Sequence, residues 1–218
     1  MFEAGVTKRI RDGSNAFAGA AGAAAVCVGL LAAMSQAHAG HDVFHIFTPL
    51  VEPGEIGTEA LSTIQTDLPS QDEGVRAVHE VAIHAGITDF WMAKLALGLE
   101  KPLHEAYGVN AIALENVFRL PGSSFGRFDA GWFTGFSAAV DGDATNAVEF
   151  GPVITVDAGP VALAFNPFFE KTFGQNREDG IAFSYGWRAT YGLAENLSIG
   201  LEGYGEIENI ADSPAARD

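Results

Sequence analysis

Alternation of side-chain character, repeated in nine runs between residues 55 and 208, most constrains what this chain can fold into. Residues 79–99, HEVAIHAGITDFWMAKLALGL, illustrate it. Successive side chains of a strand point to opposite faces, so Trp91 and Leu95 share an apolar face, while Lys94 lies on the other. A soluble sandwich buries such an apolar face, whereas a membrane barrel turns it to lipid and turns the charge to the lumen. This segment alone fits both.

Turn residues separate the nine runs, and no stretch after residue 40 has a competing helical periodicity. We therefore expect an all-β, antiparallel up-and-down fold. The connections after the first, third, fifth and seventh runs are longer or more charged, as are the extracellular loops of outer-membrane barrels. The connection LPGSSFGRFD, after the fourth run, is an exception. The predicted strands are residues 55–65, 76–85, 90–100, 107–118, 130–140, 146–156, 161–172, 180–191 and 197–208.

Comparison of the two faces across the runs favours a transmembrane β-barrel. The bulky, almost uncharged face is predicted to contact lipid, and its representatives are Trp91, Leu95, Leu97, Phe150, Phe165, Tyr185 and Trp187. The other face carries single charges among Gly, Ala and Ser, and these are predicted to face the lumen: Glu80, Lys94, Glu115, Glu149, Glu170, Arg188, Glu202 and Glu206. Small side chains with a few ion pairs suit the interior of a narrow barrel. A secreted soluble β-barrel or sandwich that binds a ligand remains the alternative.

The first 39 residues have the parts of a secretory signal. Lys8, Arg9 and Arg11 precede an apolar run over residues 16–34, and a small-x-small site ends at Ala39, where we expect cleavage. An N-terminal membrane anchor is the alternative, because the run approaches the roughly 20 residues that span a bilayer. Export together with a membrane barrel predicts the outer membrane of a Gram-negative bacterium, with its lipid as a partner.

The expected organisation is a signal peptide (1–39), a periplasmic N-terminal segment (40–54), a β-barrel (55–208) and a polar tail (209–218). The only cysteine, Cys27, lies in the signal, so the remaining residues offer no disulfide. The chain has 28 acidic and 12 basic residues, a formal net charge of −16. Since nothing in it resembles a basic footprint, we expect no nucleic-acid partner.

An odd number of strands conflicts with barrel closure. Bacterial single-chain barrels have even strand numbers, but only about nine runs are present, and the sequence then continues as GEIENIADSPAARD. This polar, proline-containing segment is unsuited to a membrane strand. We expect the barrel to be incomplete here, with 10 or 12 strands when complete. Strained closure of the first run onto the last is the alternative.

Three stretches carry a resemblance to a known family: HEVAIHAGITDFW, NAVEFGPVITVDAGPVALAFNPFFEKTFG and FSYGWRATYGLAENLSIGLEGYGEIENI. They resemble the hairpins of proteobacterial outer-membrane barrel proteins grouped with the phenol-degradation MetA-pathway barrels. The resemblance covers residues 78–210. It implies an outer-membrane barrel with a polar lumen that passes or binds small organic molecules, no enzymatic activity, and recognition by the outer-membrane assembly machinery.

The charged lumen is the first candidate site. Lys94 and Arg188 are predicted to neutralise the inward glutamates, either as structural filling or as a constriction that selects solutes by charge. Because glutamates outnumber these two bases, a pathway here would favour cationic or neutral solutes. We therefore expect a passive channel or a binder for small solutes.

Histidines and serines supply the weaker candidates. His41, Asp42 and His45 would lie near the mature N-terminus, where a metal site is conceivable, but the spacing lacks a second ligand cluster. We predict a solvated segment there, with no metal and no cofactor. An outer-membrane acyl hydrolase needs a Ser or Thr within hydrogen-bond reach of a His. The inward serines do not lie in a Gly-x-Ser-x-Gly signature, so no catalytic residue is predicted; they are Ser137, Ser184 and Ser198.

Overall fold

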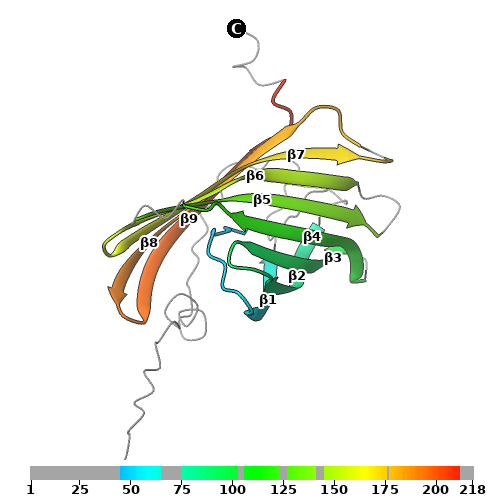
Figure 1. Cartoon of the computed structure of the whole chain (residues 1–218). Coiled ribbons are helices and arrows are strands. Elements are labelled where there is room, and N and C mark those ends of the chain that lie inside the picture. Colours follow the sequence, from blue (N-terminus) through cyan, green and yellow to red (C-terminus); the bar gives the residue numbers. More distant parts are fainter. Residues whose placement is uncertain are drawn as a thin grey trace, which may run out of the picture.

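A computed structural model of the chain describes residues 45–64, 75–102, 106–122, 127–140, 145–175 and 177–211. The predicted signal peptide with Cys27, and also His41 and Asp42, lie outside these residues. Nine strands form one sheet in the order of the chain, and every neighbouring pair is antiparallel. The sheet curls into an open half-barrel (Figure 1). The strands are β1 (Ile56–Ile64), β2 (Val75–Gly86), β3 (Trp91–Pro102), β4 (Gly108–Arg119), β5 (Phe128–Ala139), β6 (Asn146–Ala158), β7 (Val161–Phe173), β8 (Ala182–Ala194) and β9 (Leu197–Ile207).

The expected all-β, up-and-down arrangement of nine strands is confirmed, with small shifts at the strand ends. The strand β5 begins two residues earlier than predicted, at Phe128. The two added residues, Phe128 and Asp129, pair with Val156 and Thr155 of β6. Asp129 also forms an ion pair with Arg119 of β4, with 2.6 Å between Oδ2 and Nη2. The strand β8 begins two residues later than predicted, because Gly180 has a φ of 101° and belongs to the preceding turn.

Two connections at the same rim explain the sharp reversals of the chain. The β6–β7 turn consists of Gly159 and Pro160, and Gly159 has a φ of 67°, which a two-residue hairpin turn requires. The other tight turn, residues 195–196, joins β8 to β9. The connections at the opposite rim cover residues 65–74, 103–107, 140–145 and 174–181, and each is longer than these two turns. The exception expected from the sequence is confirmed, because the long β4–β5 connection, residues 120–127, lies at the rim of the tight turns.

The concave face of the sheet is filled by residues 45–51, which we call the inner segment (blue in Figure 1). Its Phe47 packs with four inward side chains of the strands β4–β7: Val117, Phe133, Val153 and Phe168. The ring centroids of Phe47 and Phe133 are 4.4 Å apart. The Phe47 backbone N–H donates to Asn166 Oδ1 at 2.7 Å, and Asn166 Nδ2 donates to the Phe47 carbonyl at 3.1 Å. The inner segment is therefore part of the core.

Two prolines accommodate this packing. The β6–β7 ladder is interrupted between the pairs Phe150–Phe169 and Ile154–Phe165. Pro152 and Pro167 lie in this interval, and neither can donate to a ladder because proline has no backbone N–H. The interruption leaves the centre of the sheet irregular at the position where Asn166 and Phe168 meet Phe47.

The convex face carries the bulky apolar side chains, and many of them are exposed. Leu95 is 53% exposed and Trp187 is 39% exposed. Aromatic side chains contact one another across neighbouring strands, as in the stacked rings of Trp91 and Phe118 with centroids 6.1 Å apart. Near β9, Trp187 lies over Gly203, where an added Cβ would be 2.4 Å from the indole nitrogen. The bulky side chains thus form a nearly continuous apolar surface on the outside of the curl.

Candidate functional site: the charged interior

Lys94 is the centre of a buried charge cluster on the concave face. Its Nζ lies 2.7 Å from Glu80 Oε1, 3.0 Å from Glu59 Oε2 and 3.3 Å from Glu115 Oε2. The side chains of Lys94, Glu80 and Glu115 are only 3%, 4% and 8% exposed. The four residues come from four consecutive strands, β1 to β4. Three carboxylates therefore share one ammonium group in a space that is largely shielded from water.

Small residues make room for this cluster. Ala82, Ala96 and Ala113 are opposite one another across β2, β3 and β4, and all three are buried. The methyl groups of these alanines take up little space over the sheet face that carries the long Glu and Lys side chains. The alternation of small and charged residues in the sequence therefore has a steric reason.

The inner segment contacts the cluster through His45 and Phe47. His45 Nδ1 lies 3.2 Å from Glu59 Oε1, and the Lys94 ammonium lies 5.6 Å from the centre of the Phe47 ring. Burial, with the nearby Lys94 charge, lowers the pKa of His45 to about 4, although Glu59 opposes this shift. At neutral pH the imidazole is therefore uncharged, and its Nδ1–H can donate to Glu59.

The other predicted interior residues lie in a second region, on β6 to β9. Arg188 Nη1 lies 3.5 Å from Glu202 Oε1, and both side chains are about one-third exposed. Glu149 and Glu170 are opposite each other in the β6–β7 ladder, and Ser184 Oγ donates to Glu149 Oε1 at 3.4 Å. Glu206 is exposed on β9. The structure thus brings Glu80, Lys94 and Glu115 together, but it separates them from Arg188 and its partner.

Sequence reasoning missed three residues of the interior: Phe47, Glu59 and Asn166. The faces of the first run were not assigned, although Glu59 alternates in step with the half-buried Gly57 and Leu61. Asn166 is a polar residue at an inward position of a strand between Ala164 and Phe168, and this was the available signal. Nothing in residues 45–51 alternates, so the sequence pattern does not predict that Phe47 enters the core.

The residues predicted to face lipid all lie on the convex face. Leu95, Phe165, Tyr185 and Trp187 are exposed there. Trp91, Leu97 and Phe150 are half-buried. Trp91 donates from Nε1 to Asn116 Oδ1 at 3.0 Å.

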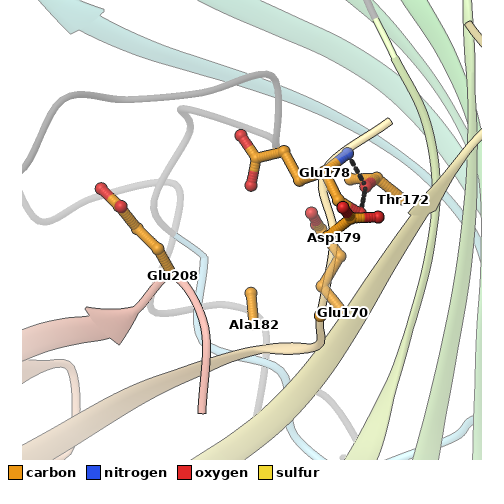
Figure 2. Close-up of a pocket in the computed structure, with 7 residues that line it drawn as sticks. Glu170, Thr172, Glu178, Asp179, Ala182 and Glu208 are labelled. Carbon is orange, nitrogen blue, oxygen red and sulfur yellow. Dashed lines mark hydrogen bonds between the residues drawn. The ribbon is translucent and has the colours of Figure 1, made fainter. Parts of the chain in front are cut away.

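A shallow depression at the rim with the long connections collects four carboxylates. Figure 2 shows Glu170 of β7, Glu178 and Asp179 of the β7–β8 connection, and Glu208 after β9 around it. Thr172 fixes the connection, because the Glu178 backbone N–H donates to its Oγ1 at 2.8 Å. Among the described residues, no group of three or more His, Cys, Asp or Glu side chains could hold a metal ion.

One serine lies close to a histidine on the convex face. Ser62 of β1 is opposite His79 of β2, and Ser62 Oγ is 2.8 Å from His79 Nδ1. The other ring nitrogen, Nε2, lies 3.1 Å from the Tyr107 hydroxyl. The three serines considered from the sequence, at positions 137, 184 and 198, are not in this group.

Comparison with known proteins gives no relative from which a function could be inferred, so a functional proposal has to rest on the geometry described above. No family model, curated protein or solved structure matches the chain. In the described part of the chain, no helix has the length and apolar character needed to cross a membrane.

Proposed function

We propose that this chain forms an outer-membrane β-barrel protein that binds small cationic or neutral solutes at its acidic interior. One observation carries the proposal: bulky apolar side chains are exposed on the convex face, while charged side chains are buried on the concave face. A soluble sandwich has the opposite distribution of side chains. In a membrane, the exposed apolar surface would contact hydrocarbon, and its burial would become favourable.

The filled interior favours binding, or passage that requires displacement of the inner segment, over a permanently open pore. Phe47 and its hydrogen bonds to Asn166 occupy the centre of the concave face. The Arg188–Glu202 region is less covered and more acidic overall, since Glu149, Glu170 and Glu206 lie on neighbouring strands. Cationic or neutral solutes would therefore meet less electrostatic opposition there than anions.

Membrane fractionation tests the location. The full chain should stay in the outer-membrane pellet of a Gram-negative host after a carbonate wash. Its recovery in the soluble fraction would instead support the secreted soluble binding protein.

Conductance measurements test whether the interior is open. In a planar bilayer, we expect little steady conductance, and any openings should prefer cations. A large, permanent, anion-selective conductance would contradict the proposal.

Substitution on the two faces tests the orientation in lipid. Arg at Leu97 or Phe165 should cost about 2–4 kcal/mol of folding free energy in lipid if these side chains lie near the bilayer midplane. Ser184→Arg is the matched inward control, because Glu149 lies within hydrogen-bond distance of Ser184. Urea-induced unfolding of the outward and inward variants in lipid vesicles measures the loss of folding free energy for each. Equal losses for the outward and inward substitutions would refute the orientation.

Ester hydrolysis is a second candidate function, and the Ser62–His79 pair favours it. If the Tyr107 hydroxyl accepts a hydrogen bond from Nε2–H, Nδ1 is free to remove the Ser62 hydroxyl proton as Oγ attacks an ester carbonyl, and the imidazolium then gives this proton to the alcohol that leaves as the ester C–O bond breaks. A fluorophosphonate probe tests this directly, because it should label Ser62 in the unmodified chain and fail to label the Ser62→Ala and His79→Ala variants. Absence of labelling in the unmodified, folded chain removes this candidate.

A further inference from the structure

The convex face of the sheet carries very few charged side chains. Of the strand residues whose side chains the structure describes, only two charged ones alternate in step with the outward positions, and both are lysines: Lys101 of β3 and Lys171 of β7. Each lies within two residues of the end of its strand, at the rim with the long connections. In a chain with a formal net charge of −16, the apolar convex surface is therefore bordered at this rim by positive charge.

The two lysines differ in what their ammonium groups contact. Lys171 Nζ donates to the backbone carbonyls of Glu178 and Gly180, so it holds the β7–β8 connection in place. The Lys101 ammonium instead lies 5.9 Å from the centre of the Tyr107 ring. No carboxylate or carbonyl of the described residues lies within hydrogen-bond or ion-pair distance of it. The charge of Lys101 is thus available to a ligand.

A chain of hydrogen bonds orients the Tyr107 hydroxyl in the same patch. Ser62 Oγ lies 2.8 Å from His79 Nδ1, and His79 Nε2 lies 3.1 Å from the Tyr107 hydroxyl oxygen. When Nε2 carries the ring proton, Ser62 donates to Nδ1 and Nε2–H donates to Tyr107. The hydroxyl proton of Tyr107, a residue that is 57% exposed, then remains for an acceptor outside the protein. These four residues, which we call the rim patch, present one cation and one oriented O–H donor.

Exposed apolar side chains continue from the rim patch along the same strands. On β2, Val81 and Ile83 follow His79 in the outward positions and are 43% and 50% exposed. On β3, Leu95 is 53% exposed and alternates in step with Lys101. A ligand that contacts both parts needs an anionic group that accepts hydrogen bonds, joined to a long apolar group. A free anion or a plain hydrocarbon would contact only one of the two parts.

We propose that the rim patch binds the phosphate group of an anionic membrane lipid, whose acyl chains lie along the apolar surface of β2 and β3. Lys101 supplies the positive charge, and the Tyr107 hydroxyl donates a hydrogen bond to a phosphate oxygen. Basic and aromatic side chains at the end of the apolar band are suited to the interface of a membrane. Binding uses the same ring tautomer as ester hydrolysis but breaks no bond. This inference rests on the proposed membrane location.

Three probes separate the two parts of this ligand. The full chain, folded in detergent micelles, is titrated with short-chain phosphatidylglycerol, with diacylglycerol of the same chain length and with inorganic phosphate, and native mass spectrometry measures the bound fraction. Phosphatidylglycerol should bind at least about tenfold more tightly than either of the others, because it alone contacts both the ammonium group and the apolar surface. Equally tight binding of diacylglycerol would indicate a purely apolar contact, and equally tight binding of inorganic phosphate would indicate a site for a free ion. Either result would overturn the proposal.

Substitutions test whether the lipid occupies the rim patch. Lys101→Met should weaken phosphatidylglycerol binding at least about tenfold, and Tyr107→Phe, which removes only the hydroxyl, at least about threefold. Lys171→Met is the matched control, because this outward lysine lies at the same rim but already donates to carbonyls, and it should change the affinity by less than about twofold. Equal losses for both lysines, or unchanged affinity of both rim-patch variants, would refute the site. Recovery of the chain in a soluble fraction would refute the membrane location alone, because the lipid titration is performed in micelles.

Discussion

At the scale of single residues, the stability of the interior depends on Lys94. Three carboxylates face its ammonium group at 2.7–3.3 Å, and the Phe47 ring lies over it. Removal of a charge from water is expensive, and the cost is recovered only when partners are close. The Lys94 ammonium therefore neutralises three carboxylates, whereas each glutamate of the cluster shares a single cation.

Lys94→Met should lower the free energy of unfolding by about 3–5 kcal/mol, because it leaves buried carboxylates without their shared cation. Glu80→Gln should cost less, since two other carboxylates stay beside Lys94. Lys101→Met, in the same strand, is the control. Its ammonium is near the Tyr107 ring and outside the cluster, so a change below about 1 kcal/mol is expected. Urea unfolding followed by tryptophan fluorescence measures all three, and equal effects of Lys94→Met and Lys101→Met would contradict the role of the cluster.

His45 should make docking of the inner segment sensitive to pH. Its pKa falls from 6.5 in the unfolded chain to about 4 in the fold, so the unfolded chain binds a proton more readily between these values. Stability is therefore complete above pH 6.5 and decreases as the pH falls towards 4, with a slope of up to about 1.4 kcal/mol per pH unit.

A His45→Phe variant isolates this contribution. The groups that face His45 are Lys94, Glu59, Glu80 and Arg188, and all of them remain in the variant. Unfolding of both proteins is measured from pH 7 to pH 4. The difference between their stability curves should change within this interval, and parallel curves would show that the histidine does not titrate as described.

At the scale of elements, the inner segment joins strands that are distant in the chain. Phe47 packs against side chains of β4, β5, β6 and β7, and Asn166 of β7 holds its backbone through two hydrogen bonds. The prolines of β6 and β7 interrupt the ladder beside this contact. The segment therefore compensates for backbone pairing that the sheet lacks at its centre.

Substitution of Phe47 and Asn166 measures this compensation. Phe47→Ala should cost about 3–5 kcal/mol, the range for a buried phenylalanine. Asn166→Ala should cost about 1–3 kcal/mol, because it leaves the buried Phe47 N–H without its acceptor. If one docked segment underlies both effects, the double variant should lose less than the sum. Additive losses would indicate that the two residues act independently.

The strands could be predicted from the sequence because each is encoded locally. Period-two alternation and Gly-rich or Asp-rich turns located all nine, and errors arose only at ends such as Gly180, where a positive φ belongs to the turn. The Lys94 cluster was partly predictable, since Glu80 and Glu115 alternate in step with Lys94 across neighbouring strands. Phe47 and His45 were not, because their positions depend on contacts with residues far along the chain.

At the scale of the whole molecule, order should decrease from the middle of the sheet to β9. The strands β4 to β7 surround the Phe47 cluster, whereas every residue from Tyr191 to Glu202 is exposed. Hydrogen exchange by mass spectrometry should therefore show faster exchange in β8 and β9 than in β4 to β6. Uniform protection across the sheet would mean that another interaction stabilises the edge.

The inner segment also has a consequence for the order of folding. Each strand pairs with the next in the chain, so the sheet can grow one hairpin at a time. The contact between Phe47 and Asn166 instead closes a loop across 119 positions, at an entropic cost of roughly 4 kcal/mol if the intervening chain is unfolded. That cost largely disappears once β1 to β7 are paired, because the short link from Val51 to β1 then delivers the segment to its site. During synthesis, residues 45–51 leave the ribosome before every strand, yet we expect them to reach their place only after β1 to β7 have paired.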